Sequence, residues 1–157
     1  MRPPLWEPLR VKVIRAQVTD LSHAAPLFAS YREFYGEPYD LEASTSFLAS
    51  RLARDESVVL LATEGDAVVG FVQIYPAFSS TRLAPIWILN DLFVVEAARG
   101  LGAVDALLET AVTLAVDAGV VSIELATAHT NLRAQSVYAR HGYESDEEFR
   151  HYEKPLP

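Results

Sequence analysis

The feature that most constrains the fold is a long apolar run that ends in a glycine-bearing turn and continues as an amphipathic segment. The run covers residues 86–95 and is interrupted only by Asn90 and Asp91. A turn with glycines follows at 99–102, and apolar residues then recur at helical spacing over 103–118. A buried strand that leads directly into a helix is typical of domains in which a sheet and its helices share one core.

The remaining patterns alternate between strands and helices along the chain. β-branched runs at 57–63 and 67–75 flank Glu64-Gly65-Asp66, which predicts a hairpin, because glycine tolerates the positive φ of a tight turn. This alternation indicates an α/β (α+β) fold. Caps and apolar spacing predict further helices over 21–35, 40–52 and 131–140, further strands over 11–15 and 120–127, a loop over 76–85, and one or two strands in the tail 143–156.

Length and composition suit a single domain. The chain has 157 residues, of which 50% are hydrophobic and 22% charged, so its apolar content offsets the entropy of ordering one core. Its longest apolar runs are too short to cross a bilayer, and the first residues lack the apolar segment of a signal peptide. We therefore expect one domain over 1–157, with its core at about 11–156, in the cytoplasm and without a membrane partner.

Composition also disfavours several kinds of site and partner. The absence of cysteine excludes disulfides, thiolate metal sites and a cysteine nucleophile. The formal net charge of −8 argues against a nucleic-acid partner, which needs a basic face. The acidity suits a cationic small molecule, and it serves solubility equally well. The histidines show no paired spacing with carboxylates, so no metal site is expected.

The turn at 99–102 has a chemical consequence. The first N–H groups of the helix that follows have no partner within the helix, and together with the helix dipole they suit an anion such as a phosphate. Glycine lets a bulky ligand approach the backbone closely. The plain alternative is that these glycines serve the turn alone, as they do in many strand-to-helix connections.

With these elements in this order, the sequence resembles the GNAT superfamily of N-acetyltransferases. The resemblance covers residues 11–156 and rests on the turn at 99–104 after a long strand, the helix-capping Asn131, and Tyr138 in the last helix. It implies a GNAT-like mixed, partly antiparallel central sheet of six to seven strands flanked by about four helices. Residues 90–94 and 131–142 look most like the branch of spermidine/spermine acetyltransferases, although that branch carries a carboxylate where this chain has Asn90.

The family resemblance implies acetyl-CoA as the co-substrate and assigns residues to it. The pantetheine arm would pair with the backbone of the strand before the turn, and the pyrophosphate would lie on the amides of the turn. Asn131 would contact the arm beside Ala134, and Tyr138 would protonate the departing sulfur. Without the family pattern, Tyr138 reads as a packing residue. The strand and turn residues so assigned are Leu92, Phe93, Val94, Arg99, Gly100, Leu101, Gly102, Ala103 and Val104.

Two residues depart from the family pattern at the turn. Val104 stands where the family has a second small residue, and Asp105 stands where members often carry Lys or Arg. A carboxylate there suits the helix dipole but repels a pyrophosphate nearby. We therefore expect weaker binding of acetyl-CoA than is usual in the family.

The attacking amine must lose a proton, and Asp91 is the first candidate to accept it or to anchor the amine. A carboxylate within an apolar strand is costly unless it has a partner or a function; a hydrogen bond to a nearby loop is the open alternative. Glu124 is the second candidate, and it may equally face solvent at a sheet edge. The substrate-binding candidates are Tyr31, Arg32, Tyr35, Asn90 and Asp91.

The family resemblance implies an enzyme that transfers the acetyl group of acetyl-CoA to a primary amine of a small molecule or peptide by direct attack in a ternary complex. Aromatic faces attract an ammonium group, whereas Arg32 favours a substrate that carries a carboxylate. The alternative is a non-catalytic CoA-binding or regulatory module on the same fold. The family resemblance further implies a homodimer, with Trp87 or the carboxy-terminal strand at the contact; the open alternative is that Trp87 lies in the core.

Overall fold

The computed structural model describes residues 11–157, which form two compact units. The first unit ends at Ala126 and contains the whole sheet, and the second unit spans Thr127–Pro157. The expectation of a single domain over 1–157 stays a prediction.

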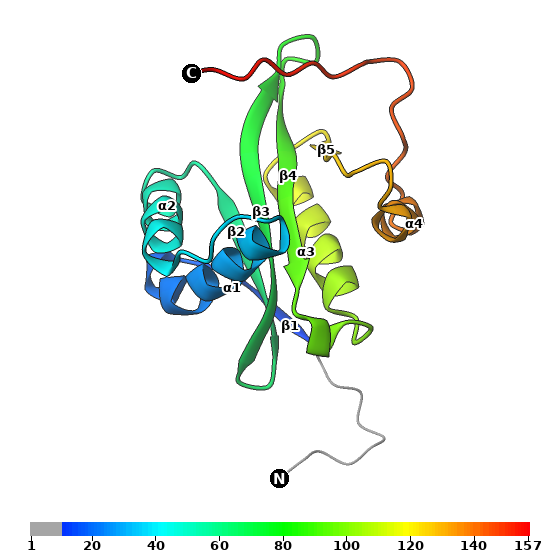
Figure 1. Cartoon of the computed structure of the whole chain (residues 1–157). Coiled ribbons are helices and arrows are strands. Elements are labelled where there is room, and N and C mark those ends of the chain that lie inside the picture. The colour runs from blue at the N-terminus through cyan, green and yellow to red at the C-terminus, as the bar shows by residue number, and fades with distance from the viewer. Residues whose placement is uncertain (1–10) are drawn as a thin grey trace. The chain divides into compact units, whose positions relative to one another are not determined.

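The first unit is built on one sheet of five strands in the order of the sequence (Figure 1). Neighbouring strands from β1 to β4 are antiparallel, and β5 runs parallel to β4. The sheet is therefore mixed and mainly antiparallel, as expected. The strands are β1 Lys12–Arg15, β2 Val58–Glu64, β3 Ala67–Ser79, β4 Ala84–Val94 and β5 Ile123–Glu124.

Helices cover both faces of this sheet. The side chain of Phe71 in β3 points toward α1, since its ring lies 6.0 Å from the ring of Phe28. The preceding Gly70 faces α3, because a Cβ there would lie 3.5 Å from Leu107 Cδ1. Successive side chains of a strand point to opposite faces, so α1 and α3 lie on opposite faces. The helices of this unit are α1 Leu21–Phe34, α2 Leu41–Ala53 and α3 Ala103–Asp117.

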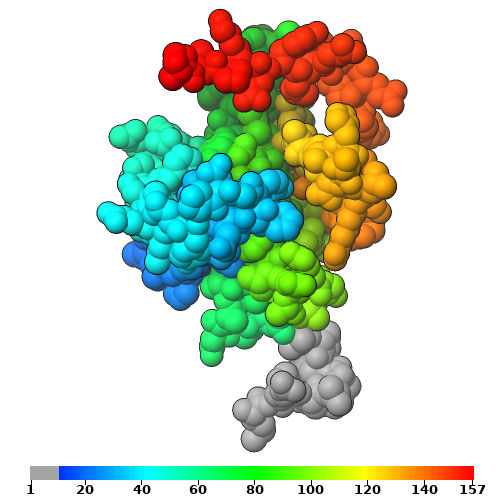
Figure 2. Space-filling view, viewed as in Figure 1, coloured from blue at the N-terminus to red at the C-terminus, as the bar shows by residue number. Residues whose placement is uncertain are grey.

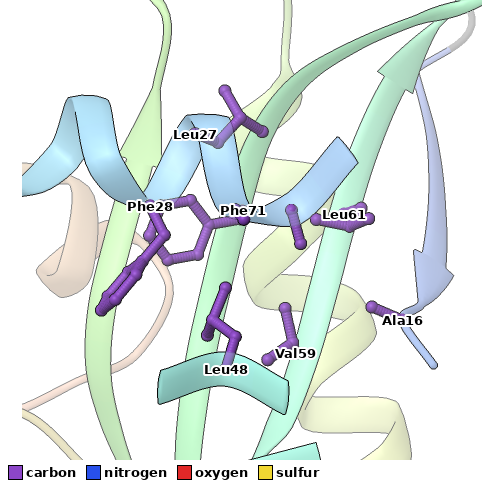
Figure 3. Close-up of a cluster of buried hydrophobic side chains, with 9 residues drawn as sticks. Ala16, Leu27, Phe28, Leu48, Val59, Leu61 and Phe71 are labelled. Atoms are coloured by element: carbon purple, nitrogen blue, oxygen red, sulfur yellow. The ribbon is translucent and has the colours of Figure 1, made fainter. Parts of the chain in front are cut away.

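The core on the α1 and α2 face is a cluster of buried apolar side chains (Figure 3). The members from α1 lie on one face of that helix, and the two members from β2 occupy alternate positions of the strand. Figure 2 shows the side chains of α1 and α2, in blue to cyan, lying over the sheet on this side. The labelled residues of the cluster are Ala16, Leu27, Phe28, Leu48, Val59, Leu61 and Phe71.

The sheet has fewer strands than the six to seven expected. The strand predicted over 120–127 is only Ile123–Glu124, and residues 143–156 contain no strand, although one or two were predicted. The tail carries a run of charged residues between 144 and 154 and Pro155, which leaves it no alternating apolar face to bury against a sheet. Residues 11–157 contain four α-helices, as expected.

The loop predicted over 76–85 is also wrong, because β3 continues through Pro76 to Ser79 and pairs with β4. A proline lacks the N–H that a central strand needs. Here β2 begins at Val58, opposite Ile74, so Pro76 has a strand neighbour only on its β4 side. It therefore removes no bond to β2. Trp87, paired with Pro76, is 6% exposed, so it lies in the core and does not offer a surface for a second copy of the chain.

The second unit contains α4, Leu132–Arg140. The side-chain oxygen of Asn131 accepts a hydrogen bond from the N–H of Ala134 at 3.1 Å, which confirms Asn131 as the cap of this helix. Gly142 follows the helix with a φ of +81°, as expected for a helix-terminating glycine.

Candidate active site

The turn between β4 and α3 requires glycine because of its backbone conformation. Gly100 and Gly102 adopt φ values of 82° and 84°, which L side chains rarely adopt. A Cβ at either position would have nothing within 4 Å. Gly102 also caps α3 without a side-chain hydrogen bond, whereas Asp40 and Asn131 cap α2 and α4 through their side chains.

The N–H groups of this turn fall into two sets. Those of Arg99 and Leu101 donate within the turn, at 3.1 and 3.4 Å. The others meet no acceptor among residues 11–157, and at the start of a helix they suit an anion such as a diphosphate. The turn lies at the surface, in yellow-green in Figure 2. The unpaired donors are those of Gly100, Gly102, Ala103 and Val104.

The side chain of Arg99 adds a positive charge to the same turn. It is exposed and forms no ion pair with any described residue. The sequence predicts that the amides of all residues from 99 to 104 face a pyrophosphate. The N–H groups of Arg99 and Leu101 are instead used within the turn, although Arg99 can still contribute its guanidinium.

The edge of β4 that precedes this turn is open. The parallel partner β5 pairs only with Trp87 and Ile88, and no other strand of residues 11–157 pairs with β4 on that side. An open strand edge presents a row of free N–H and C=O groups that an extended, amide-containing ligand can pair with. Residues 89–94 therefore offer the backbone edge that the sequence predicts for the cofactor arm.

A bulge in β4 determines which backbone groups face this edge. Gln73 of β3 is opposite Asp91 and the next residue, Ile74, is opposite Leu89, so Asn90 is an extra residue in β4. The extra residue changes the side of β4 toward which the N–H groups of the following residues point. The N–H of Trp87 donates away from β3, to Ser122, whereas the N–H of Val95 donates to Val69 of β3. In a regular strand, two residues an even number apart would point the same way.

Alternation from Val95 then places the N–H and C=O groups of Leu92 and Val94 at the open edge. Those of Phe93 face β3, and its carbonyl oxygen lies 2.9 Å from the position of a Cβ on Gly70. Leu92 and Val94 can thus pair with a ligand through their backbone, whereas Phe93 can contribute only its side chain. The expected backbone role of Phe93 is corrected in this respect.

Asp91 lies in a buried hydrogen-bond network. It is 4% exposed; its Oδ2 accepts from Gln73 Nε2 at 2.9 Å and its Oδ1 from Asn90 Nδ2 at 3.0 Å. The partner expected as an alternative was a loop, but both donors are side chains of strands. Burial and the Asp91 charge together raise the pKa of Tyr75 to about 12, against a smaller lowering by Arg51. Asp91 and Arg51 therefore both lie within electrostatic reach of Tyr75.

Aromatic rings connect β4 to the end of α1. The ring of Tyr31 lies 6.2 Å from that of Phe93 and 4.9 Å from that of Tyr35. Phe34 lies 6.5 Å from Phe93 and 5.3 Å from Tyr35, and both Phe34 and Tyr35 are about two thirds exposed. The predicted substrate residues Tyr31 and Tyr35 are thus brought together, next to a residue of the candidate cofactor strand.

Two charged candidates have partners of their own. Arg32 lies 3.8 Å from Glu37 in an ion pair, so its charge is partly balanced within the chain. Glu124 of β5 binds Arg82 at 3.0 Å, and both side chains are about half exposed. This contact agrees with the alternative in which Glu124 faces solvent at an edge, and its role as a base stays a prediction.

Tyr138 lies in α4 of the second unit. Its ring packs against that of Tyr143 at 5.7 Å. The Asn131 side-chain oxygen accepts one hydrogen bond in capping α4, and an amide side chain also offers N–H donors to a ligand. The roles of Asn131, Ala134 and Tyr138 stay predictions.

Sequence reasoning missed Gln73 and Phe34. Gln73 interrupts the apolar run of β3, as Asp91 interrupts that of β4. Because burying a polar group is costly, the same reasoning that pointed to Asp91 could have pointed to Gln73. Phe34 follows Tyr31 at helical spacing and shares its face of α1.

No group of three or more His, Cys, Asp or Glu side chains in residues 11–157 is placed to hold a metal ion. None of the helices in this range is long and apolar enough to cross a membrane.

Comparisons with known proteins agree on a family. The profile of the Acetyltransferase (GNAT) family matches residues 24–143. An uncharacterized N-acetyltransferase of Bacillus subtilis (strain 168), YhfO, is 44% identical over 142 residues, which are 90% of this chain and 95% of that protein. The crystal structure of a probable acetyltransferase has a TM-score of 0.86 and 41% identity, over 93% of this chain and 99% of its own.

A more distant structure shares the fold alone. It is an aminoglycoside acetyltransferase from an uncultured soil metagenomic sample, solved in complex with trehalose. Its TM-score is 0.82 at 16% identity, over 94% of this chain and 97% of its own.

Proposed function

Because this chain belongs to the acetyltransferase (GNAT) family, we propose that it transfers the acetyl group of acetyl-CoA to a primary amine of a small molecule or peptide. The observation that carries the proposal is the continuity of two features of one segment. The open edge of β4 is followed directly by a turn whose N–H groups lack acceptors. An extended arm with amides and a diphosphate at its end matches that order of groups.

The residues of the chain fit this co-substrate. Leu92 and Val94 would pair with the amides of the arm, and the free N–H groups of the turn, together with the Arg99 guanidinium, would hold the diphosphate. When bound, acetyl-CoA supplies an acetyl group as a thioester, which an amine can attack. The N–H groups at the edge are also donors for the acetyl carbonyl oxygen, which gains negative charge during attack.

The transfer is proposed to be direct, in a ternary complex. The amine nitrogen forms a bond to the carbonyl carbon, the bond from that carbon to sulfur breaks, and the amine loses one proton while the sulfur gains one. Tyr138 is proposed to donate the proton that the sulfur receives. The chain has no cysteine to carry the acetyl group in a thioester of its own.

The base is the less defined part of the mechanism. Glu124 is held by Arg82, and Asp91 is 4% exposed with a donor on each oxygen. Both contacts favour a route in which water removes the proton from the amine. The pH dependence of kcat/KM in Asp91→Asn and Glu124→Gln would show whether either carboxylate titrates in the reaction.

The acceptor is proposed to be a cationic amine that approaches the aromatic rings at the end of α1. Exposed aromatic faces attract ammonium groups, and the net charge of −8 attracts cations over longer distances. The panel of amines to be tested includes polyamines, because of the resemblance to the spermidine/spermine branch, and aminoglycosides, which the distant structure's enzyme acetylates by name. A homodimer is proposed from the family, and light scattering would test it.

The experiment that tests the function follows release of free thiol from acetyl-CoA with the pooled amines. Because the chain contains no cysteine, every thiol that appears comes from CoA. Amine-dependent release, with an acetylated product seen by mass spectrometry, supports the enzyme. CoA binding without release supports the non-catalytic module, and no binding of CoA refutes both.

A further inference from the structure

A hydrogen-bond network at the bulge consists of the buried side chains of Gln73 and Asp91 and the exposed Asn90, and its Gln73–Asp91 bond joins β3 to β4. Gln73 is 0% exposed and is paired with Asp91 across the two strands. Its Nε2 donates to one oxygen of Asp91, while Asn90 Nδ2 donates to the other. Asn90 is the extra residue of the bulge, so the carboxylate is bound both to the opposite strand and to the bulge itself.

The orientation of the Gln73 amide is fixed by its partner. A carboxylate only accepts hydrogen bonds, so the nitrogen of Gln73 must face it. Gln73 Oε1 is then buried without a partner among residues 11–157, which is unfavourable for stability. An apolar side chain of similar size would fill the same space without that penalty. The retained cost indicates that the bond to Asp91 serves a purpose other than filling the core.

We propose that Gln73, Asp91 and Asn90 form a clamp that holds the bulge of β4, and that Gln73 and Asp91 are thereby positioning residues for the ligand-binding edge. This inference rests on the proposed function, because the edge matters for activity only if acetyl-CoA binds there. The clamp acts through the backbone: with the bulge in place, the N–H groups of Leu92 and Val94 face the open edge. If β4 paired with β3 without a bulge, so that Asn90 lay opposite Gln73, each later residue would shift by one position and the N–H groups of Leu92 and Val94 would face β3.

This role differs from that of a base. A base must meet the proton it accepts, and Asp91 is 4% exposed with both oxygens already hydrogen-bonded. The charged and titratable groups near it are Tyr75, on the same strand as Gln73, and Arg51 of α2, which lies 2.8 Å from Glu56 in an ion pair. A positioning carboxylate can be exchanged with its partner, whereas a base cannot be moved to another strand.

The test is therefore a swap of donor and acceptor. Asp91→Leu alone removes both acceptor oxygens of the clamp with little change in side-chain size, and so breaks it. Gln73→Met breaks the same contact with the carboxylate unchanged. The double variant Gln73→Glu/Asp91→Asn restores one donor and one acceptor between the strands and keeps the net charge. Asp66→Asn, in the exposed β2–β3 turn, makes the same change of charge without a buried partner and serves as the control.

Two readouts follow each variant. Calorimetry gives the Kd of CoA, and NMR gives the hydrogen exchange of the backbone amides of residues 90–95 in the free protein. We expect each single variant to weaken CoA binding and to speed exchange by about tenfold or more, the worth of a buried hydrogen bond to a charged group. The double variant should return both to within about threefold of the wild type, and the control should change neither.

The outcomes separate the clamp from the proposed function. A double variant that unfolds, or that stays as defective as Asp91→Leu in CoA affinity and amide exchange, overturns the clamp. Single variants with wild-type exchange and CoA affinity also overturn it. If exchange follows the swap but the wild-type protein binds no CoA, the clamp holds the bulge as proposed and the acetyltransferase function fails.

Discussion

Gly70→Ala is expected to disturb the ligand-binding edge of β4, because Gly70 lies in β3, which pairs with the opposite edge of β4. Gly70 does not need glycine for its φ, but a Cβ there would lie 2.9 Å from both Phe93 O and Val94 Cγ2. Atoms at that distance must separate, and one of them belongs to the backbone, so β4 has to shift where it carries the groups that face the ligand.

The magnitude follows from two opposing effects. Forcing one extra methyl into a packed interior costs about 1–3 kcal/mol. Replacing glycine by alanine lowers the entropy of the unfolded chain and returns about 0.4–1 kcal/mol. The net loss of about 1–2 kcal/mol should lower Tm by about 2–8 °C for a chain of this size. Displacement of the Val94 N–H should in addition weaken CoA binding by about fivefold, the worth of one ordinary hydrogen bond.

Gly119→Ala is the matched control. Gly119 ends α3 with a φ of +70° and open space around its Cβ position, so the substitution costs about 1–2 kcal/mol through backbone conformation alone. Thermal denaturation and calorimetry with CoA should show similar losses of Tm in both variants but weaker CoA binding only in Gly70→Ala. The reasoning is refuted if Gly70→Ala keeps the wild-type Tm, or if it loses stability with no change in CoA affinity.

Three further changes test other parts of the site. Tyr138→Phe should lower kcat by about tenfold or more while the Kd of CoA stays unchanged; equal kcat in stopped-flow thiol assays would remove Tyr138 from the chemistry. Asp105→Asn should strengthen CoA binding at low salt, because it removes a negative charge near the diphosphate; an unchanged Kd by calorimetry contradicts this. Burial and Asp91 raise the pKa of Tyr75 from 10.0 to about 12, so the unfolded chain releases this proton first and stability falls as pH rises from 10 to 12. In Tyr75→Phe, denaturant midpoints should fall less over that interval, and an unaltered slope counts against the assignment.

The parts of the fold that could be predicted from sequence are those governed by local rules. Asp40 and Asn131 cap their helices as their side-chain chemistry predicts, and the Glu64-Gly65-Asp66 turn joins β2 to β3. The extension of β3 through Pro76 could not be read in this way. Its acceptance depends on where β2 begins, which is a property of the assembled sheet.

The candidate site shows the same division. The cost of a carboxylate in an apolar strand pointed to Asp91, but its partners depended on the register between β3 and β4. The glycines at 100 and 102 predicted a turn that could bind an anion. Which N–H groups of that turn are hydrogen-bonded and which are free depends on its three-dimensional structure. Tertiary pairing decides these questions, and a single sequence contains no direct record of it.

The bulge at Asn90 explains why one strand can serve both the fold and a ligand. On the amino-terminal side of the bulge, the outward N–H of Trp87 binds Ser122 beside β5, so that part of β4 is an interior strand. Beyond it, the outward groups belong to Leu92 and Val94. In a regular strand, the backbone groups that point away from β3 come from every second residue, and the bulge interrupts this spacing. A regular parallel strand therefore cannot continue its pairing with β4 beyond the bulge. This accounts for β5 ending at Glu124, short of the predicted 127, and it leaves the edge nearest the glycine turn open. Deletion of Asn90 is therefore expected to lengthen the pairing of β5 with β4, as measured by hydrogen exchange, and to abolish CoA binding. A deletion variant in which β5 stays short would contradict this explanation.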